Sequence, residues 1–211
     1  MLKEVEKRIL SSIILIPIAI FFIIKGSVFF IFFLTILYLV TTYEWFKMSK
    51  NFFLLQFAGI IFLSFSFYST YTIREEGFEF FLFIVIICIF TDIGGYMFGK
   101  IFKGPKLGSI SPNKTYSGVI GSLIMSFISA LIFIKYFEID LIFNADNSIL
   151  FLLILFISLI SQIGDLIISF FKRKAKLKDA GKILPGHGGL LDRIDGLIFV
   201  MPVIYFLLLL K

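Results

Sequence analysis

The chain consists of long apolar runs joined by short polar connections. The apolar runs cover residues 9–24, 27–44, 52–71, 78–98, 116–136, 148–171 and 194–210. A helix needs about 20 apolar residues to cross a hydrocarbon core about 30 Å thick. The pattern therefore predicts an all-α, polytopic helical membrane protein with about seven transmembrane helices.

The amino-terminal run follows Lys3, Lys7 and Arg8, an arrangement that is also typical of a signal peptide. This run is long, however, and has no obvious small-residue cleavage site. It continues into a second run through the tight Lys25-Gly26 connection. We therefore expect residues 1–24 to contain a retained first helix.

The distribution of Lys and Arg indicates how the helices are oriented. The basic connections are the amino terminus, 45–51, 99–115 and 172–193, and the intervening 72–77 and 137–147 are richer in acidic residues. Basic connections stay preferentially in the cytoplasm. We expect a multi-pass protein of the inner (plasma) membrane, with its amino terminus and both long basic loops in the cytoplasm and its carboxyl terminus outside.

The composition supports this class of protein. Hydrophobic residues make up 59% of the 211 residues, against about 45–50% in soluble domains, and the mean hydropathy is +1.04. We expect one integral membrane domain over residues 1–211, with N-terminal helices in 1–98 and catalytic helices and cytoplasmic loops in 99–211. The net charge of +6 is explained by membrane topology and anionic lipid rather than by nucleic acid.

Cysteine chemistry is limited by the presence of a single cysteine. Cys88 lies in an apolar run, so an intramolecular disulfide and a cysteine-based metal cluster are excluded. Packing is the simplest role for this thiol.

Two acidic residues fall inside apolar runs. Asp165 follows Ser-Gln-Ile-Gly near the cytoplasmic end of the sixth run, and Asp92 lies near the cytoplasmic end of the fourth. An ionised carboxylate at such a position costs at least about 2–3 kcal/mol unless it is paired or bound to metal. A function is favoured for both, and a hydrogen bond that packs two helices together is the alternative.

Asp192 and Asp195 are three residues apart. If the last helix starts near Leu190, they share one face of it. Together with Asp165 they would form an oxygen-rich cluster suited to Mg²⁺. The alternative is that they complement the helix dipole or pair with Arg193.

The loop before these acids is basic and then rich in glycine. The basic run from Lys172 to Lys182 can serve as a topological anchor at anionic headgroups. Gly186, Gly188 and Gly189 can present backbone N–H groups to phosphate oxygens, although such glycines also form simple turns. His187 is the single histidine, so we interpret it as a phosphate or ribose contact rather than a metal ligand.

The other cytoplasmic loop, residues 106–115, superficially resembles a phosphate-binding P-loop. Asn113 stands where the second glycine should be, Pro112 is next to it, and an all-helical chain has no βαβ unit. Ser111 and Lys114 nevertheless lie just before a span, where hydroxyl, ammonium and free N–H groups can hold phosphate.

The whole run from Ser169 to Asp195 resembles the signature of the phosphatidate cytidylyltransferases, also called CDP-diacylglycerol synthases. The resemblance extends to Asp92-Ile-Gly-Gly-Tyr-Met-Phe-Gly-Lys100, Ser111-Pro-Asn-Lys-Thr115, Gly164-Asp165, Arg8-Ile-Leu-Ser11 and Tyr43-Glu-Trp45. It therefore covers nearly the whole chain.

One departure from the family concerns its middle region. Members are commonly longer, with additional hydrophobic segments between the Glu-Trp and Asp-Gly-Gly-Tyr elements, whereas here only residues 52–71 fill that interval. Loss of an even number of helices would preserve the orientation of all that follow. The departure bears on the surface through which lipid reaches the site and on any homodimer contact.

The resemblance implies transfer of CMP from CTP to phosphatidate, giving CDP-diacylglycerol and pyrophosphate. The lipid phosphate is already an anionic nucleophile, so positioning and charge neutralisation would dominate catalysis. Mg²⁺ held by Asp165, Asp192 and Asp195 would bridge the nucleotide phosphates, and a second, monovalent cation stays an open alternative.

The resemblance also assigns residues to the substrates. Lys172, Arg173, Lys178 and Arg193 are expected at triphosphate and pyrophosphate oxygens, and Ser111 and Lys114 at the lipid phosphate or the nucleotide. Asp179 would orient a lysine or meet the metal. Asp92, His187, Gly188 and Gly189 complete the expected binding residues.

Three other functions compete with this one. Another CTP-dependent enzyme, acting on an ether lipid or a polyprenol, would share the nucleotide site. An ion-coupled transporter would use Asp92 and Asp165 in an ion pathway, but needs no glycine-rich and acidic loop on one face. A scaffold with a basic lipid-binding surface would tolerate scrambling of that loop.

Overall fold

The computed structural model describes residues 2–50, 52–108, 111, 114–137, 147–184, 186 and 188–210, and all described helices are α-helical. In chain order they are α1 (Leu2–Lys25), α2 (Ser27–Met48), α3 (Phe53–Glu76), α4 (Phe78–Phe102), α5 (Tyr116–Tyr136), α6 (Asn147–Lys174), α7 (Leu191–Ile194) and α8 (Leu197–Leu209). Two isolated β-bridges, Lys106–Thr115 and Leu184–Gly188, join points within the two polar loops.

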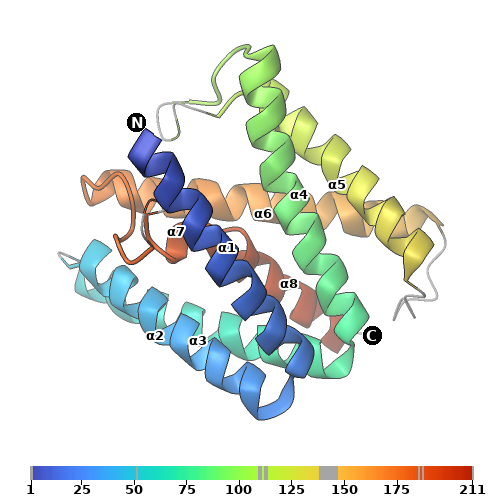
Figure 1. The fold of residues 1–211 in the computed structure, drawn as a ribbon, viewed down its shortest axis with the longest axis horizontal. Helices are drawn as coiled ribbons and strands as arrows, with labels where there is room; N and C mark the ends of the chain where they lie inside the picture. Colours follow the sequence, from blue (N-terminus) through green and yellow to red (C-terminus); the bar gives the residue numbers. More distant parts are fainter. Residues whose placement is uncertain are drawn as a thin grey trace.

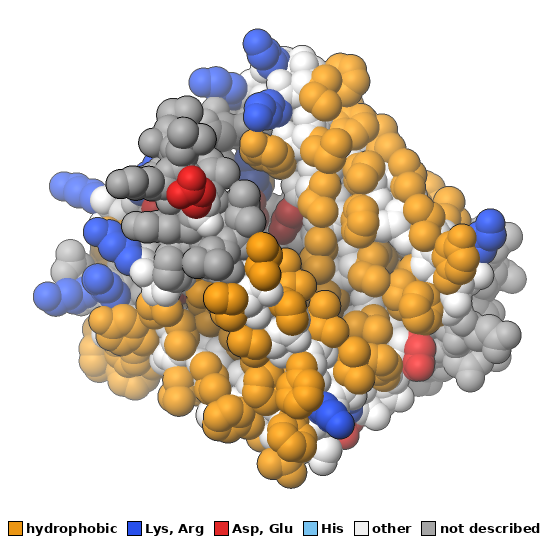
Figure 2. All heavy atoms as spheres, in the orientation of Figure 1, with side chains coloured by type: hydrophobic (Ala, Val, Ile, Leu, Met, Phe, Trp, Pro, Cys, Tyr) orange, Lys and Arg blue, Asp and Glu red, His pale blue; other side chains and the backbone are white. Residues whose placement is uncertain are grey.

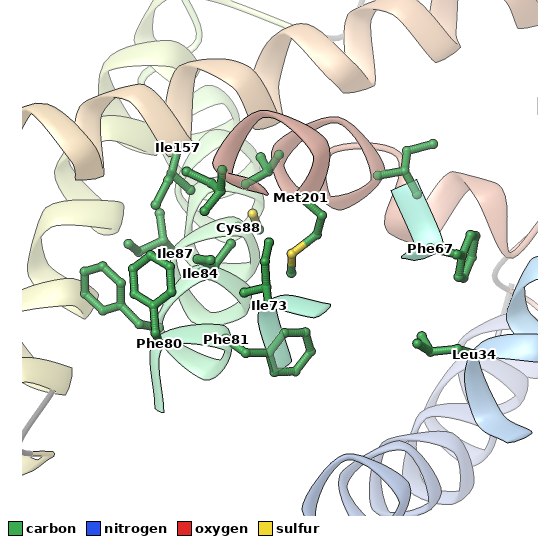
Figure 3. Packing of buried hydrophobic residues seen from close by; sticks show 14 of the residues in the cluster. Leu34, Phe67, Ile73, Phe80, Phe81, Ile84, Ile87, Cys88, Ile157 and Met201 are labelled. Carbon is green, nitrogen blue, oxygen red and sulfur yellow. The ribbon is translucent and has the colours of Figure 1, made fainter. Parts of the chain in front are cut away.

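Helices α2 and α3 lie on one side of the molecule and α5 on the other (Figure 1). Helices α4 and α5 make an antiparallel pair, and α6 crosses behind them. Helix α8 packs between α3 and α6, while α2 packs on α3. The core lies where α3, α4, α6 and α8 meet, and Figure 3 shows Ile73, Ile84, Ile157 and Met201 from these four helices pointing toward one another.

The all-α membrane class predicted from the apolar runs is confirmed. Five helices, α2 to α6, are long and apolar enough to cross a membrane, and Ile13–Lys25 within α1 and Leu197–Leu209 are shorter apolar helices. Figure 2 shows hydrophobic side chains covering the outward surface of α4 and α5. Exposed isoleucines at 120, 124 and 128 contribute to this surface, which is the behaviour expected of a lipid-facing helix.

The last apolar run differs from the expected single helix over 194–210. The structure divides it into α7 and α8, with Asp195 and Gly196 between them. Gly196 lies directly against Ser161 of α6, where a Cβ atom would overlap the hydroxyl. This close approach brings the turn, and with it Asp195, against the sixth helix.

Glycines allow α4 and α5 to approach closely. A Cβ atom at Gly94 would overlap the carbonyl oxygen of Gly121, and one at Gly121 would overlap Phe98. The Ser122 hydroxyl donates a 2.7 Å hydrogen bond to the Thr91 carbonyl across the same interface. Close backbone approach of this kind is how membrane helices gain packing energy, and here it fixes Asp92 relative to the start of α5.

The first two helices turn at Gly26, whose φ of +62° lies in the left-handed region that glycine adopts without strain. The Arg74 guanidinium, at the end of α3, lies directly against Gly26 and donates a 3.1 Å hydrogen bond to the Ile23 carbonyl. Arg74 also lies 5.5 Å from the centre of the Phe30 ring. One side chain thus holds the end of α1 to both neighbouring helices.

Candidate functional site

A cavity of about 420 Å³ lies where α4, α5, α6 and the two polar loops meet. This volume lies within the range of small-molecule sites. The residues expected from the sequence that line it are Asp92, Ser111, Lys114, Asp165, Lys172, Asp179, Asp192, Arg193 and Asp195. The structure therefore gathers both intramembrane acids and parts of both cytoplasmic loops around one space.

Lys114 connects the first polar loop to α6. Its ammonium lies 2.7 Å from Asp165 Oδ2 and donates a 3.4 Å hydrogen bond to the Gln162 carbonyl. Thr115, the next residue, caps α5 by accepting a 3.2 Å hydrogen bond from the Gly118 N–H. The predicted position of Lys114 at a helix start is thus confirmed, and its nearest partner is the carboxylate of Asp165.

Asp165 and Asp195 form the acidic centre of the cavity. Their carboxyl groups are close neighbours, and Asp195 is 7% exposed. Ser169 donates a 3.2 Å hydrogen bond to Asp165 Oδ1, and the Gly196 N–H donates a 2.9 Å bond to Asp195 Oδ1. Gly164 makes the approach possible, since a Cβ atom there would lie 2.8 Å from the Asp195 carbonyl oxygen.

Electrostatics at Asp195, in the connection between α7 and α8, reflect this crowding. Burial raises the pKa of the Asp195 carboxyl well above its usual range, and the nearby Asp165 and Asp92 carboxylates raise it further. Two carboxyl groups in contact cannot both carry full charge without a neutralising cation or proton. In the structure the Lys114 ammonium, 2.7 Å from Asp165, supplies part of that positive charge.

Asp192 has different partners from those expected. Lys172 Nζ lies 2.7 Å from Asp192 Oδ1, and the N–H groups of Ala180 and Gly189 donate bonds of 2.8 and 3.1 Å to Oδ2. Both carboxylate oxygens are therefore engaged within the second polar loop. Asp92, on α4, lines the same cavity as Asp165 and Asp195.

A metal ion at Asp165 and Asp195 would need further ligands besides these two carboxylates. Among the described residues, no three Asp, Glu, His or Cys side chains form a group that could hold a metal ion on their own. Mg²⁺ commonly uses only one or two protein carboxylates and completes its shell with water and substrate phosphates. The contact between Asp165 and Asp195 fits such a site, and a third ligand from Asp192 stays a prediction.

The basic residues divide into two groups. Lys172 and Arg193 line the cavity. Arg173 and Lys178 are exposed outside its lining, and Arg173 donates a 3.2 Å hydrogen bond to the Leu177 carbonyl near the end of α6. The structure thus brings two of the four expected phosphate contacts into the cavity.

Some backbone groups of the glycine-rich loop form hydrogen bonds within the loop and to Asp192. Gly188 adopts a φ of +87° and its carbonyl accepts a 3.0 Å hydrogen bond from the Leu184 N–H, while the Gly189 N–H is bonded to Asp192. Neither glycine lines the cavity. His187, Pro185, Pro112 and Asn113 lie outside the described residues.

Glu44 is a residue next to the site for which sequence reasoning assigned no role. It is 1% exposed and accepts hydrogen bonds of 3.1 and 2.8 Å from the N–H groups of Leu190 and Leu191. The available signal was an acidic residue at the end of the second apolar run, inside the Tyr-Glu-Trp element.

These features define a helical membrane protein with a cavity lined by both carboxylates and Lys and Arg side chains, and the cationic side chains suit a phosphate-bearing ligand. The sequence profile of the cytidylyltransferase family matches residues 49–210. The chain therefore belongs to the cytidylyltransferase family.

Curated relatives are consistent with this membership. The chain is 40% identical over 152 residues to the phosphatidate cytidylyltransferase of Staphylococcus saprophyticus, a match that covers 72% of this chain and 57% of the relative. It is 43% identical over 154 residues to the protein of the same name from Staphylococcus aureus strain COL, covering 72% of this chain and 56% of the relative. The chain thus spans little more than half the length of these relatives.

Proposed function

We propose that this protein transfers CMP from CTP to phosphatidate, giving CDP-diacylglycerol and pyrophosphate for phospholipid synthesis. Family membership and the names of the relatives support a CTP-dependent reaction on this lipid. The observation that carries the proposal is the contact of Asp165 with Asp195 beside Lys114 in a single cavity. This arrangement offers both a cation site and a cationic group for phosphate oxygens.

In the proposed reaction, a phosphate oxygen of phosphatidate attacks the α-phosphorus of CTP. A new phosphorus–oxygen bond forms, the bond to the oxygen that bridges the α- and β-phosphates breaks, and pyrophosphate leaves with the bonding electrons. The nucleophile is already anionic, so no side chain has to remove a proton from it. The main requirement is to hold two anions in line and neutralise their charge.

The cations of the cavity suit this requirement. Lys114 and Arg193 line the same space as the acidic centre, and Ser111 adds a hydroxyl-bearing residue from the first loop. Lys172 supports the site through its ion pair with Asp192. Arg173, Lys178, Gly188 and Gly189 remain predicted contacts of phosphate oxygens, and His187 remains a predicted phosphate or ribose contact.

Mg²⁺ is the proposed cofactor, held by Asp165 and Asp195, with Asp192 as the further ligand expected from the sequence. When bound, it would neutralise charge on the nucleotide phosphates and the leaving pyrophosphate. Lys114 holds Asp165 in place from the first loop, and the Gly196 N–H orients Asp195. These contacts preorganise the oxygen ligands before substrates arrive.

The position of the cavity suits a lipid substrate. Asp92 and Tyr96 line the cavity on α4, and Tyr96, Met97 and Ile93 are exposed on that helix. Figure 2 shows an acidic side chain in a recess beside the hydrophobic surface of α4. A phosphate group in the cavity and acyl chains along this apolar surface would satisfy both parts of phosphatidate.

The proposed topology places the cavity at the cytoplasmic side of the plasma membrane. Helices α1 and α8 would join the five longer spans to give seven crossings, with the amino terminus inside. The basic connections around the cavity support this orientation. CTP from the cytoplasm and the headgroup of phosphatidate would then reach the site together.

The decisive experiment uses the purified full chain in detergent with radiolabelled CTP, Mg²⁺ and phosphatidate. We expect labelled CDP-diacylglycerol and stoichiometric pyrophosphate. An ether-lipid phosphate and a polyprenol serve as competing substrates in parallel assays. Efficient CTP turnover with either of these and none with phosphatidate would replace the proposed substrate, and the absence of turnover with all three would overturn the proposal.

A further inference from the structure

Glu44, at the end of α2, is buried against the second polar loop. Its two carboxylate oxygens accept hydrogen bonds from Leu190 and Leu191, at 3.1 and 2.8 Å. With 1% of its surface exposed, this carboxylate depends on those N–H groups, because a buried acid without partners costs several kcal/mol. The same bonds fix the start of α7.

Glu44 also touches the loop at two other points. A Cβ atom at Gly189 would lie 2.9 Å from both carboxylate oxygens of Glu44. One at Gly181 would overlap Glu44 Oε1. The absence of side chains at both positions lets the loop close around the carboxylate, so Glu44 contacts the loop before and after its glycine-rich turn.

The other side of the same segment is held by Asp192. Its carboxylate receives the N–H groups of Ala180 and Gly189 and the Lys172 ammonium. Two carboxylates therefore hold the backbone around Gly189. Asp192 on α7 accepts the Gly189 N–H, and Glu44 on α2 accepts the next two N–H groups. Asp195 follows immediately on the same short stretch of chain.

Glu44 is itself held in place by its neighbour. The Trp45 indole packs edge-on against Phe171 of α6, with ring centres 5.3 Å apart, and its N–H donates a 3.2 Å hydrogen bond to the Leu55 carbonyl of α3. A Cβ atom at Gly59 would overlap this indole. The end of α2 is thus locked to α3 and α6, which gives the Glu44 carboxylate a rigid base.

We propose that Glu44 is a positioning residue: it holds the segment from Gly189 to Asp195 so that Asp195 meets Asp165 in the cavity. This inference rests on the proposed function for its catalytic meaning, but the mechanical role stands on the contacts alone. Glu44 touches no reacting group. It acts through the backbone of α7, and links the amino-terminal helices to the acidic centre.

The test compares the Glu44→Gln variant of this chain with wild type by hydrogen–deuterium exchange and by Mn²⁺ binding. The amide substitution preserves size but turns one acceptor into a donor facing an N–H group. We expect exchange in a peptide covering 178–184, which contains Ala180 and the contact at Gly181 but neither of the N–H groups that bond to Glu44, to quicken at least about tenfold. Glu79→Gln, at an exposed acid on α4, is the matched control.

The second measurement is Mn²⁺ affinity, determined by electron paramagnetic resonance without nucleotide or lipid. If Glu44 only caps the start of α7, its substitution would leave this affinity unchanged. We expect Glu44→Gln to weaken Mn²⁺ binding at least about fivefold, because the acidic centre loses its alignment. Faster exchange confined to Leu190 and Leu191, or unchanged Mn²⁺ affinity alongside a loosened loop, would overturn the positioning role.

The two proposals can fail separately. If wild type shows no CTP turnover, the proposed function is overturned. The exchange in residues 178–184 then still decides whether Glu44 holds the loop. If wild type is active and the Glu44→Gln protein matches it in exchange and Mn²⁺ affinity, only the role of Glu44 is lost.

Discussion

Lys172 and Asp192 form a buried ion pair, 2.7 Å long, between the end of α6 and the short helix α7. Their side chains are 10% and 8% exposed. Because the Asp192 carboxylate also receives two backbone N–H groups, the pair closes the loop between the two helices. A residue expected to bind metal is thus engaged in holding the loop that surrounds the cavity.

Breaking this pair from one side should be more harmful than changing both partners. Lys172→Met leaves a buried carboxylate without its cation, and such losses cost about 3–5 kcal/mol. We expect a clear fall in the melting temperature of the purified protein. Adding Asp192→Asn, which still accepts the two N–H groups, should recover part of the loss; a double variant as unstable as the two losses combined would contradict the pairing.

Asp165→Asn tests the acidic centre directly. The variant keeps the size of the side chain but loses the charge that faces Lys114 and Asp195. We expect CTP-dependent turnover to fall at least about 100-fold while the protein still inserts into membranes. Radiolabelled product formation measures the effect, with Glu79→Gln as the control. Activity close to wild type would remove Asp165 from the proposed metal site. For Asp195→Asn we expect a fall in turnover as large as that for Asp165→Asn.

The packing of α4 on α5 should be sensitive to a single methyl group. Gly121→Ala places a Cβ atom onto Phe98, and overpacking of this kind costs about 1–3 kcal/mol. A melting temperature below that of wild type is expected. The matched control is Gly77→Ala, where the nearest atom to the new Cβ lies at 3.5 Å. Equal melting temperatures for the two variants would show that α4 and α5 accommodate the added methyl group without losing stability.

Arg74 offers a contrast between two kinds of contact. Arg74→Met removes the hydrogen bond to the Ile23 carbonyl and leaves that acceptor at the end of α1 unpaired, so about 1–3 kcal/mol of stability should be lost. Glu75→Gln removes only a more exposed ion pair with the same guanidinium, worth up to about 1 kcal/mol. Thermal unfolding of both variants checks the order, and a larger effect from Glu75→Gln would reverse the interpretation.

The helices could be predicted from the sequence because each long apolar run must satisfy its backbone hydrogen bonds within lipid. The gathering of Asp92, Asp165 and Asp195 was predicted only in part. The cost of an acid inside an apolar run marked Asp92 and Asp165, and the spacing from Asp192 marked Asp195. The partner of Asp192 depends instead on how the loop folds back to present the N–H of Ala180. That contact has no periodicity that a sequence could display.

The break between α7 and α8 and the role of Glu44 lay beyond the sequence for a related reason. Apolar residues continue through Ile194 and Leu197, so the pattern favours one uninterrupted helix. The close approach of Gly196 to Ser161 involves another helix, and the apolar pattern of the run does not encode it. In the sequence Glu44 is simply an acidic residue at the end of an apolar run. Its contact with the start of α7 is visible only in the structure.

The ion pair between Lys114 and Asp165 means that the cavity carries its own internal counter-ion. An incoming phosphate that binds the Lys114 ammonium must compete with Asp165 for it, and a cation that binds Asp165 must compete with Lys114. Binding of an anion to Lys114 would free Asp165 from the ion pair, and binding of a cation to Asp165 would free Lys114. If both ligands bind here as proposed, anion and cation uptake would be linked, and each ligand would lower the cost of binding the other.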